Sequence, residues 1–110
     1  MKKIYKLKAK DIQPLATGLG ACIATDRITV DGKSVRYMYR EQPDNDIDSG
    51  WRFLSGDENE EYMNNPNNHS VFDVNTIANA DPSIIPYLHA DAGMAFEKPP
   101  GNDQFMAVKK

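Results

Sequence analysis

The sequence predicts an α+β fold in which a mainly antiparallel, twisted sheet of four to six strands carries two or three short helices. Three observations lead to it. Segments with alternating apolar residues recur along the chain, short capped helical segments separate them, and no regular strand–helix–strand rhythm appears. At 110 residues the chain is long enough for one core, so we expect a single domain over residues 1–110.

The clearest local signal is the stretch Ser49–Glu61. Trp51 and Phe53 lie two residues apart, so in a strand they share one face and anchor the core. The residues Ser55–Glu58 match a capping box, in which the Glu58 carboxylate accepts from the Ser55 backbone N–H. The pattern therefore predicts a third strand over residues 50–55 and a short helix over Glu58–Met63.

Two segments before it, Ala21–Val30 and Val35–Glu41, predict a hairpin. They are joined at Asp31-Gly32, a dipeptide typical of two-residue turns. A bulge is expected at Asp26-Arg27, where the apolar pattern is interrupted. The predicted apolar face carries Cys22, Ala24, Ile28, Val30, Val35, Tyr37 and Tyr39. The opposite face carries Arg27, Arg36, Met38 and Arg40.

The remaining elements are expected to be short. They are a strand or ordered arm at Ile4–Leu7, a helix at Ala9–Ala16 ending at Gly18, a strand at Val71–Val74, a helical turn at Thr76–Ala80, a helix capped by Asp81 and reaching about His89, a strand at Gly93–Glu97, and an edge strand or tail at Phe105–Val108.

Charge is distributed unevenly along the chain. The net charge is −3, yet residues 1–10 carry five lysines and no acid. Between Glu41 and Glu61 there are eight acids against one base, Arg52. Such a field disfavours nucleic acid as a partner and favours a basic protein or a cation. The lysine-rich start is interpreted as a solvated strand or tail.

Cysteine usage and hydropathy suggest where the protein works. A single cysteine, Cys22, permits no internal disulfide and fits a reducing compartment. No signal-peptide pattern follows the basic start, and no apolar run is long enough to span a membrane. We therefore expect a cytoplasmic protein without a membrane partner, present as a monomer or weak homodimer.

No motif identifies a reaction, a metal or a cofactor. The D-x-D-x-D spacing of Asp44–Asp48 is suggestive of a calcium loop, but Ser49 and Ser55 stand where such a loop needs glycine and glutamate. Capping and surface exposure explain the acids after Ser55. No histidine is placed beside Cys22 by the sequence, so an inert core thiol is expected. The expectation is no catalytic, cofactor-binding or metal-binding residue.

The three arginines of the predicted strands leave an alternative open. If neighbouring strands align, Arg36, Arg40 and Arg52 form a basic stripe on one sheet face. A pocket near them and Cys22 would make the chain a small-ligand-binding protein, a metabolic accessory protein or an uncharacterised enzyme. The aromatic residues of the same strands could anchor a partner, but alternation favours a core role for them.

Four segments resemble a family of small bacterial proteins: Ala21–Lys33, Tyr37–Glu41, Ser49–Glu58 and Asp81–Ile85. That family was first catalogued as a domain of unknown function and later grouped with the immunity proteins of polymorphic toxin systems. The resemblance covers about residues 15–97, and Gly-Trp-Arg-Phe…Ser-Gly-Asp-Glu is its most specific part. It implies a non-enzymatic protein that binds and neutralises a cognate toxin, and it brings no established site residues.

The acidic span suggests how such a toxin would be bound. Acidic side chains steer association with a basic partner, so the toxin surface is expected to be basic. The predicted partner-binding residues are Asp44, Asp46, Asp48, Arg52, Asp57, Glu58, Glu60 and Glu61.

Overall fold

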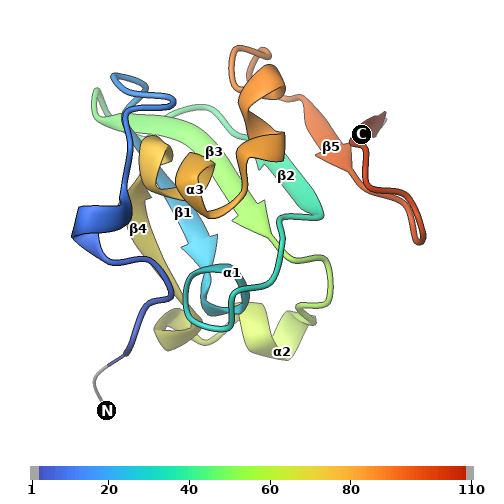
Figure 1. The fold of residues 1–110 in the computed structure, drawn as a ribbon. Helices are drawn as coiled ribbons and strands as arrows, with labels where there is room; N and C mark the ends of the chain where they lie inside the picture. The colour runs from blue at the N-terminus through green and yellow to red at the C-terminus, as the bar shows by residue number, and fades with distance from the viewer. Residues whose placement is uncertain (1–2, 109–110) are drawn as a thin grey trace.

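The computed structural model describes residues 3–108 and shows one six-stranded sheet with the strand order β4-β1-β3-β2-β5-β6 (Figure 1). Among these residues β1 and β3 run parallel and the other four neighbouring pairs are antiparallel, which confirms the α+β class. The strands are β1 (Ala21–Thr25), β2 (Tyr37–Arg40), β3 (Asp48–Leu54), β4 (His69–Asp73), β5 (Ala95–Glu97) and β6 (Met106–Val108).

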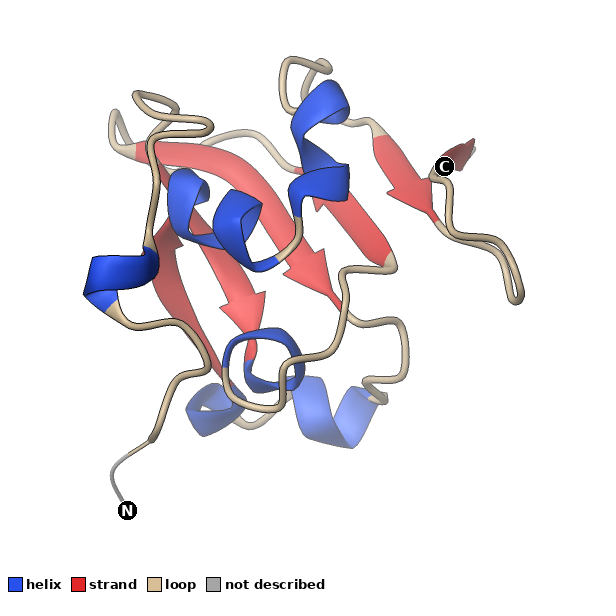
Figure 2. Ribbon diagram, viewed as in Figure 1, coloured by secondary structure: helices blue, strands red, loops and turns tan. Residues whose placement is uncertain are grey.

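The helices are all short, and α3 and η3 lie over one face of the sheet (Figure 2). The α-helices are α1 (Asp26–Thr29), α2 (Glu60–Met63) and α3 (Val74–Ala80). The 3₁₀ helices are η1 (Ala9–Asp11), η2 (Pro66–Asn68) and η3 (Pro82–Tyr87). Within residues 3–108, none of them has the length and apolar character needed to cross a bilayer.

Strand β3 is the centre of the core, as the aromatic pair predicts. Trp51 and Phe53 are 1% and 0% exposed, and their rings stack with centroids 6.0 Å apart. The Trp51 indole Nε1 also donates a hydrogen bond to the Leu88 carbonyl at 3.1 Å. This bond satisfies the buried indole N–H and joins the end of η3 to the sheet.

The predicted hairpin between Ala21–Val30 and Val35–Glu41 is wrong. Strand β3 lies between β1 and β2, so these two strands are not neighbours. In place of a bulge, Asp26 begins the helical turn α1. Gly32 adopts φ +77° and its N–H bonds to the Ile28 carbonyl, so the Asp-Gly dipeptide ends a helix instead of turning a hairpin.

The predicted faces of β2 are reversed. Met38 is fully buried and lies opposite Phe53, whereas Tyr37 and Tyr39 are only half-buried and lie on the other face. Because side chains alternate along a strand, assigning the tyrosines to the core moved every β2 side chain to the wrong side. On β1 the faces are as predicted, with Cys22 and Ala24 buried.

Two predicted helices differ in extent. The helix expected over Ala9–Ala16 is confined to η1, because the Leu15 and Ala16 N–H groups donate to the Asn75 side-chain oxygen at 2.9 and 2.8 Å. Helix α2 begins at Glu60 with Asn59 as its cap, and not at Glu58. The cap predicted at Asp81 is confirmed, since its carboxylate accepts from the Ser83 N–H.

The ends of the chain also differ from the expectation in part. Of the two forms expected for Ile4–Leu7, the strand is absent, and the arm is held in place by the Lys6 N–H, which donates to the Thr29 carbonyl at 2.9 Å. Near the other end, β6 confirms the predicted edge strand and pairs with β5. The expected strand Gly93–Glu97 is confirmed as β5, but Phe96 is buried while Met94 is 39% exposed before the strand begins.

Candidate partner-binding surface

The face of the sheet opposite α3 and η3 is the candidate site (Figures 1 and 2). Strand pairing places Ile23 beside Val71, Tyr39 beside Arg52, and Tyr37 beside Leu54 on this face. Trp51, Phe53 and Met38 alternate with them and point into the core. The candidate face is therefore built from the outward positions of four neighbouring strands.

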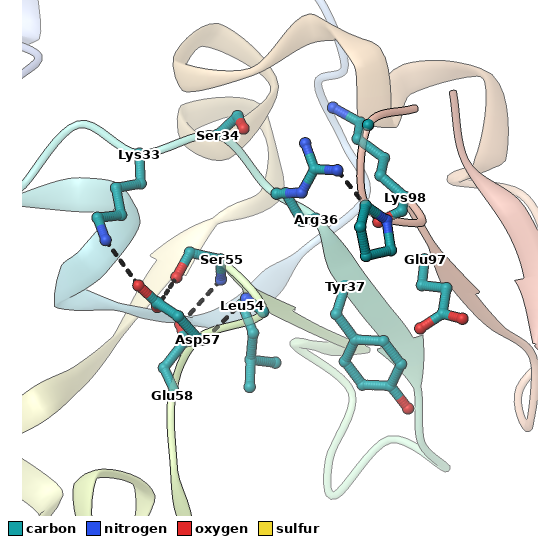
Figure 3. Close-up of a pocket in the computed structure, with 13 residues that line it drawn as sticks. Lys33, Ser34, Arg36, Tyr37, Leu54, Ser55, Asp57, Glu58, Glu97 and Lys98 are labelled. Carbon is teal, nitrogen blue, oxygen red and sulfur yellow. Dashed lines mark hydrogen bonds and ion pairs between the residues drawn. The ribbon is translucent and has the colours of Figure 1, made fainter. Parts of the chain in front are cut away.

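Two hollows lie on this face and a third adjoins it at the end of the sheet, and neighbouring hollows share lining residues. The largest, about 960 Å³, lies between the segments after β3 and β5 and includes Tyr37 and Leu54 (Figure 3). The second, about 180 Å³, includes Leu54, Tyr39 and Arg52. The third, about 250 Å³, includes Arg52 and Val71. We name the surface along Tyr37, Leu54, Tyr39, Arg52, Ile23 and Val71 the sheet groove.

Arg52 lies at the middle of the sheet groove, and its side chain is only 7% exposed. Its Nη1 and Nη2 donate to the two Asp48 oxygens at 3.0 and 2.9 Å, and its Nε donates to Glu41 at 2.9 Å. These bonds hold the pKa of Asp48 well below its usual range and raise that of Arg52. Asp44 lies 3.9 Å away, so three carboxylates surround one guanidinium.

The predicted acidic residues fall into two groups, one at each end of β3. The loop before the strand contains Asp44 and Asp46, and Asp48 is the first residue of the strand. The acids of Asp57–Glu61 follow the strand. The strand β3, Asp48–Leu54, separates the two groups. The eight predicted residues therefore do not form one cluster, and the sheet groove lies between them.

The acids after β3 differ in what they contact. Asp57 accepts from Lys33 at 2.6 Å and lies 3.5 Å from Arg27, and the Lys33 bond is the main cause of its lowered pKa. Glu58 accepts from the Ser55 N–H at 2.8 Å and from the Thr25 hydroxyl. These bonds order the segment after β3, as the capping-box pattern suggests, although no helix begins there.

Comparison with protein families decides the membership of the chain. Residues 22–109 match the family described as Immunity protein Imm33 domain. The chain belongs to this family. The match confirms the resemblance to immunity proteins and implies a toxin as partner in general terms. Comparisons with curated proteins and with solved structures gave no significant match.

In this Imm33 domain the predicted basic stripe does not form. Arg40 pairs with Trp51 and Arg52 with Tyr39, so the two arginines lie on opposite faces. Arg40 donates to the Ser49 and Ala90 carbonyls at 2.9 and 2.7 Å. Arg36 donates to carbonyls of the segment after β5, the shortest to Pro99 at 2.9 Å. Each guanidinium fixes a different loop, so they do not converge on one ligand.

Cys22 of the Imm33 domain has the surroundings of a core thiol. It is 1% exposed, and burial is the main cause that raises its pKa to about 12. Phe72 lies opposite it on β4, whereas His69 pairs with Thr25 at the other end of that strand. Within residues 3–108 no group of three His, Cys, Asp or Glu side chains is arranged to hold a metal ion.

The side chains that form the floor of the groove were not predicted from the sequence. Tyr37 and Tyr39 were expected in the core, but their rings lie 5.6 Å apart on the open face. Glu97 pairs with Tyr37 from β5 and projects to the same side (Figure 3). The available signal was the alternation in Tyr37-Met38-Tyr39: only one face of a strand can be fully buried, and the methionine is the residue there without a hydroxyl to satisfy.

Proposed function

We propose that this Imm33 domain neutralises a cognate toxin by binding it through an acidic surface and does so without catalysis. Exposed carboxylates at both ends of β3 carry the proposal. Asp46, Glu60 and Glu61 are exposed, and within residues 3–108 none of them forms an ion pair. Asp44 is 83% exposed, and its only ion pair with another described residue is the 3.9 Å approach to Arg52.

The eight predicted residues have two different roles in binding. The exposed carboxylates Asp44, Asp46, Glu60 and Glu61 provide the negative field that attracts the toxin. Asp48 and Arg52 hold the loop before β3 in shape, and Asp57 and Glu58 do the same after the strand. Charged rims of this kind mainly accelerate association and select the partner, while buried contacts determine how long the complex lasts.

The chemistry of the surface indicates a basic protein as the partner. An acidic field repels the phosphates of nucleic acid and of anionic lipid, so neither fits this surface. The proposal places the domain in the cytoplasm, where the buried Cys22 stays a free thiol. The toxin would then be intercepted in the cell that makes both proteins.

Co-expression tests the proposal. The full chain and the toxin domain encoded by the adjacent reading frame are produced together, and growth and the rate of complex formation are measured. Glu60→Lys/Glu61→Lys should slow association at least tenfold and weaken its salt dependence. Asp91→Lys/Asp103→Lys changes the charge by the same +4 at exposed positions after η3 and between β5 and β6, and should act like wild type. Wild-type chain that neither binds the toxin nor protects growth would overturn the proposal.

A further inference from the structure

We propose that the toxin docks in the sheet groove, and that its docking segment presents a lysine or arginine flanked by apolar residues. This inference rests on the proposed function and goes further by naming the surface and the chemistry of its occupant. The acids at the two ends of β3 then form the rim of the interface, and the outward side chains of the sheet form its floor.

The floor is unusually apolar for an uncovered sheet face. Val71 is 69% exposed and Met106, at the far edge of the same face, is 55% exposed. Ile23, Leu54 and Met63 are half-buried beside them. An antiparallel sheet with one solvated face normally carries polar side chains there, so an apolar stretch points to a contact with another molecule.

The two aromatic side chains of the floor have the character of binding anchors. Tyr37 and Tyr39 lie two residues apart on the same face of β2, and each lines a hollow of the groove. Tyrosine combines a large apolar ring with a polar end and few rotatable bonds, which makes it common among the residues that dominate binding energy. Burial and, after it, the neighbouring Glu41 raise the pKa of Tyr39, because both disfavour the charged phenolate.

The negative charge of the groove favours a positively charged side chain of the toxin. The second and third hollows contain the carboxylates of Glu41, Asp44 and Asp48 against the single guanidinium of Arg52. Glu41 is 53% exposed, and only its Oε2 is bonded by Arg52. A cation lying over the Tyr39 ring would meet the Glu41 carboxylate and gain a cation–π contact. An acidic occupant would be repelled at the same place.

The dimensions fit a short segment of chain. From Tyr37 on β2 to Val71 on β4 the groove crosses three inter-strand spacings, which is about 14 Å. About four or five extended residues cover that length. The docking element is therefore one exposed loop or strand end of the toxin, and the acidic rim contacts the surface around it.

Oxidative footprinting tests the groove in the wild-type complex without any substitution. The full chain is exposed to hydroxyl radicals alone and with the purified toxin domain of the adjacent reading frame. Met63 lines the groove and Met94 lies outside it before β5, so they form a matched pair. Toxin should lower the oxidation of Met63, Tyr37 and Tyr39 at least fivefold and leave Met94 within twofold.

Substitutions provide a second measurement. Tyr37→Lys/Val71→Lys places two positive charges in the groove, whereas Leu15→Lys/Met94→Lys places them at exposed apolar positions outside it. We expect the first variant to bind toxin at least 100-fold more weakly and the second within threefold. Glu41→Gln keeps an acceptor for Arg52 and should weaken binding about tenfold.

The outcomes separate the two proposals. Two results would overturn docking in the sheet groove and leave the proposed function standing. In the first, wild-type chain binds the toxin but the oxidation of Met63 is unchanged. In the second, a folded Tyr37→Lys/Val71→Lys variant binds the toxin with wild-type affinity. Wild-type chain that does not bind the toxin overturns both. Because footprinting uses the wild-type chain, a variant that fails to fold leaves the groove fully testable.

Discussion

Arg52 and Asp48 form a bidentate ion pair although both belong to strand β3. Their side chains are only 7% and 11% exposed, and the two bonds measure 2.9 and 3.0 Å. In a regular strand, residues four apart share a face but lie about 13 Å from one another. The strand is irregular here. Ala21 pairs with Asp48 and Ile23 with Arg52, so three residues of β3 oppose one of β1 around Gly50.

Removing the guanidinium should destabilise the fold strongly. Arg52→Met leaves the Asp48 carboxylate largely buried without a cation, and losing one partner of a buried pair costs about 3–5 kcal/mol. Urea denaturation followed by circular dichroism measures the change. Arg36→Met, which removes only bonds to carbonyl groups, is the control and should cost less. A loss below about 1 kcal/mol for Arg52→Met would show that the pair does not hold the loop.

Stability should fall in acid because of the same pair. The pKa of Asp48 is lower in the folded state than its unfolded value near 4. Its contribution is therefore complete above about pH 4 and is lost as the pH falls from there towards the folded pKa. Urea midpoints between pH 2 and 7 measure this. Asp48→Asn should flatten the profile, whereas Asp46→Asn in the exposed loop should leave it unchanged; equal slopes for wild type and Asp48→Asn would contradict the account.

Gly50 should not tolerate a side chain. It has φ +87°, and a Cβ there would overlap the carbonyl oxygen of Glu41. Gly93 has a similar φ of +96° but open space around it, so Gly93→Ala reports the backbone strain alone. We expect Gly93→Ala to cost about 1–2 kcal/mol and Gly50→Ala clearly more, as measured by thermal and urea unfolding. Equal costs would mean that the close approach at Gly50 is not required.

Cys22 should be unreactive in the folded protein. With its pKa raised to about 12 and the side chain buried, almost no thiolate is present or accessible at pH 8. Labelling with iodoacetamide, followed by mass spectrometry, should be at least 100-fold slower than for glutathione. The rate should recover in 6 M guanidinium chloride. Rapid labelling of the folded chain would show that β1 opens readily.

The sequence allowed the core strand and several caps to be predicted because their signals are local. The spacing of Trp51 and Phe53 indicates the inner face of β3. The capping pattern at Asp81 indicates where η3 begins. The capping-box bond between Glu58 and Ser55 formed as well, but Asn59 offered a competing cap and the helix began after it.

The topology and the groove could not be predicted because they depend on distant pairing. Asp31-Gly32 gives a strong hairpin signal, which predicts that β1 and β2 pair with each other. In the structure β3 lies between them and pairs with both. Once the hairpin was assumed, the two β2 tyrosines were assigned to the core. Arg40 and Arg52 were placed on one face for the same reason, because strand order determines which side chains meet.

A crystal structure of the full chain bound to the toxin domain of the adjacent reading frame tests the central claim most directly, through the area that each residue buries. The account predicts that Tyr37, Tyr39 and Val71 lose most of their exposed area, with a toxin lysine or arginine within about 4 Å of the Glu41 carboxylate. A complex in which the toxin contacts α3 and η3 and leaves the sheet groove open to solvent would contradict it.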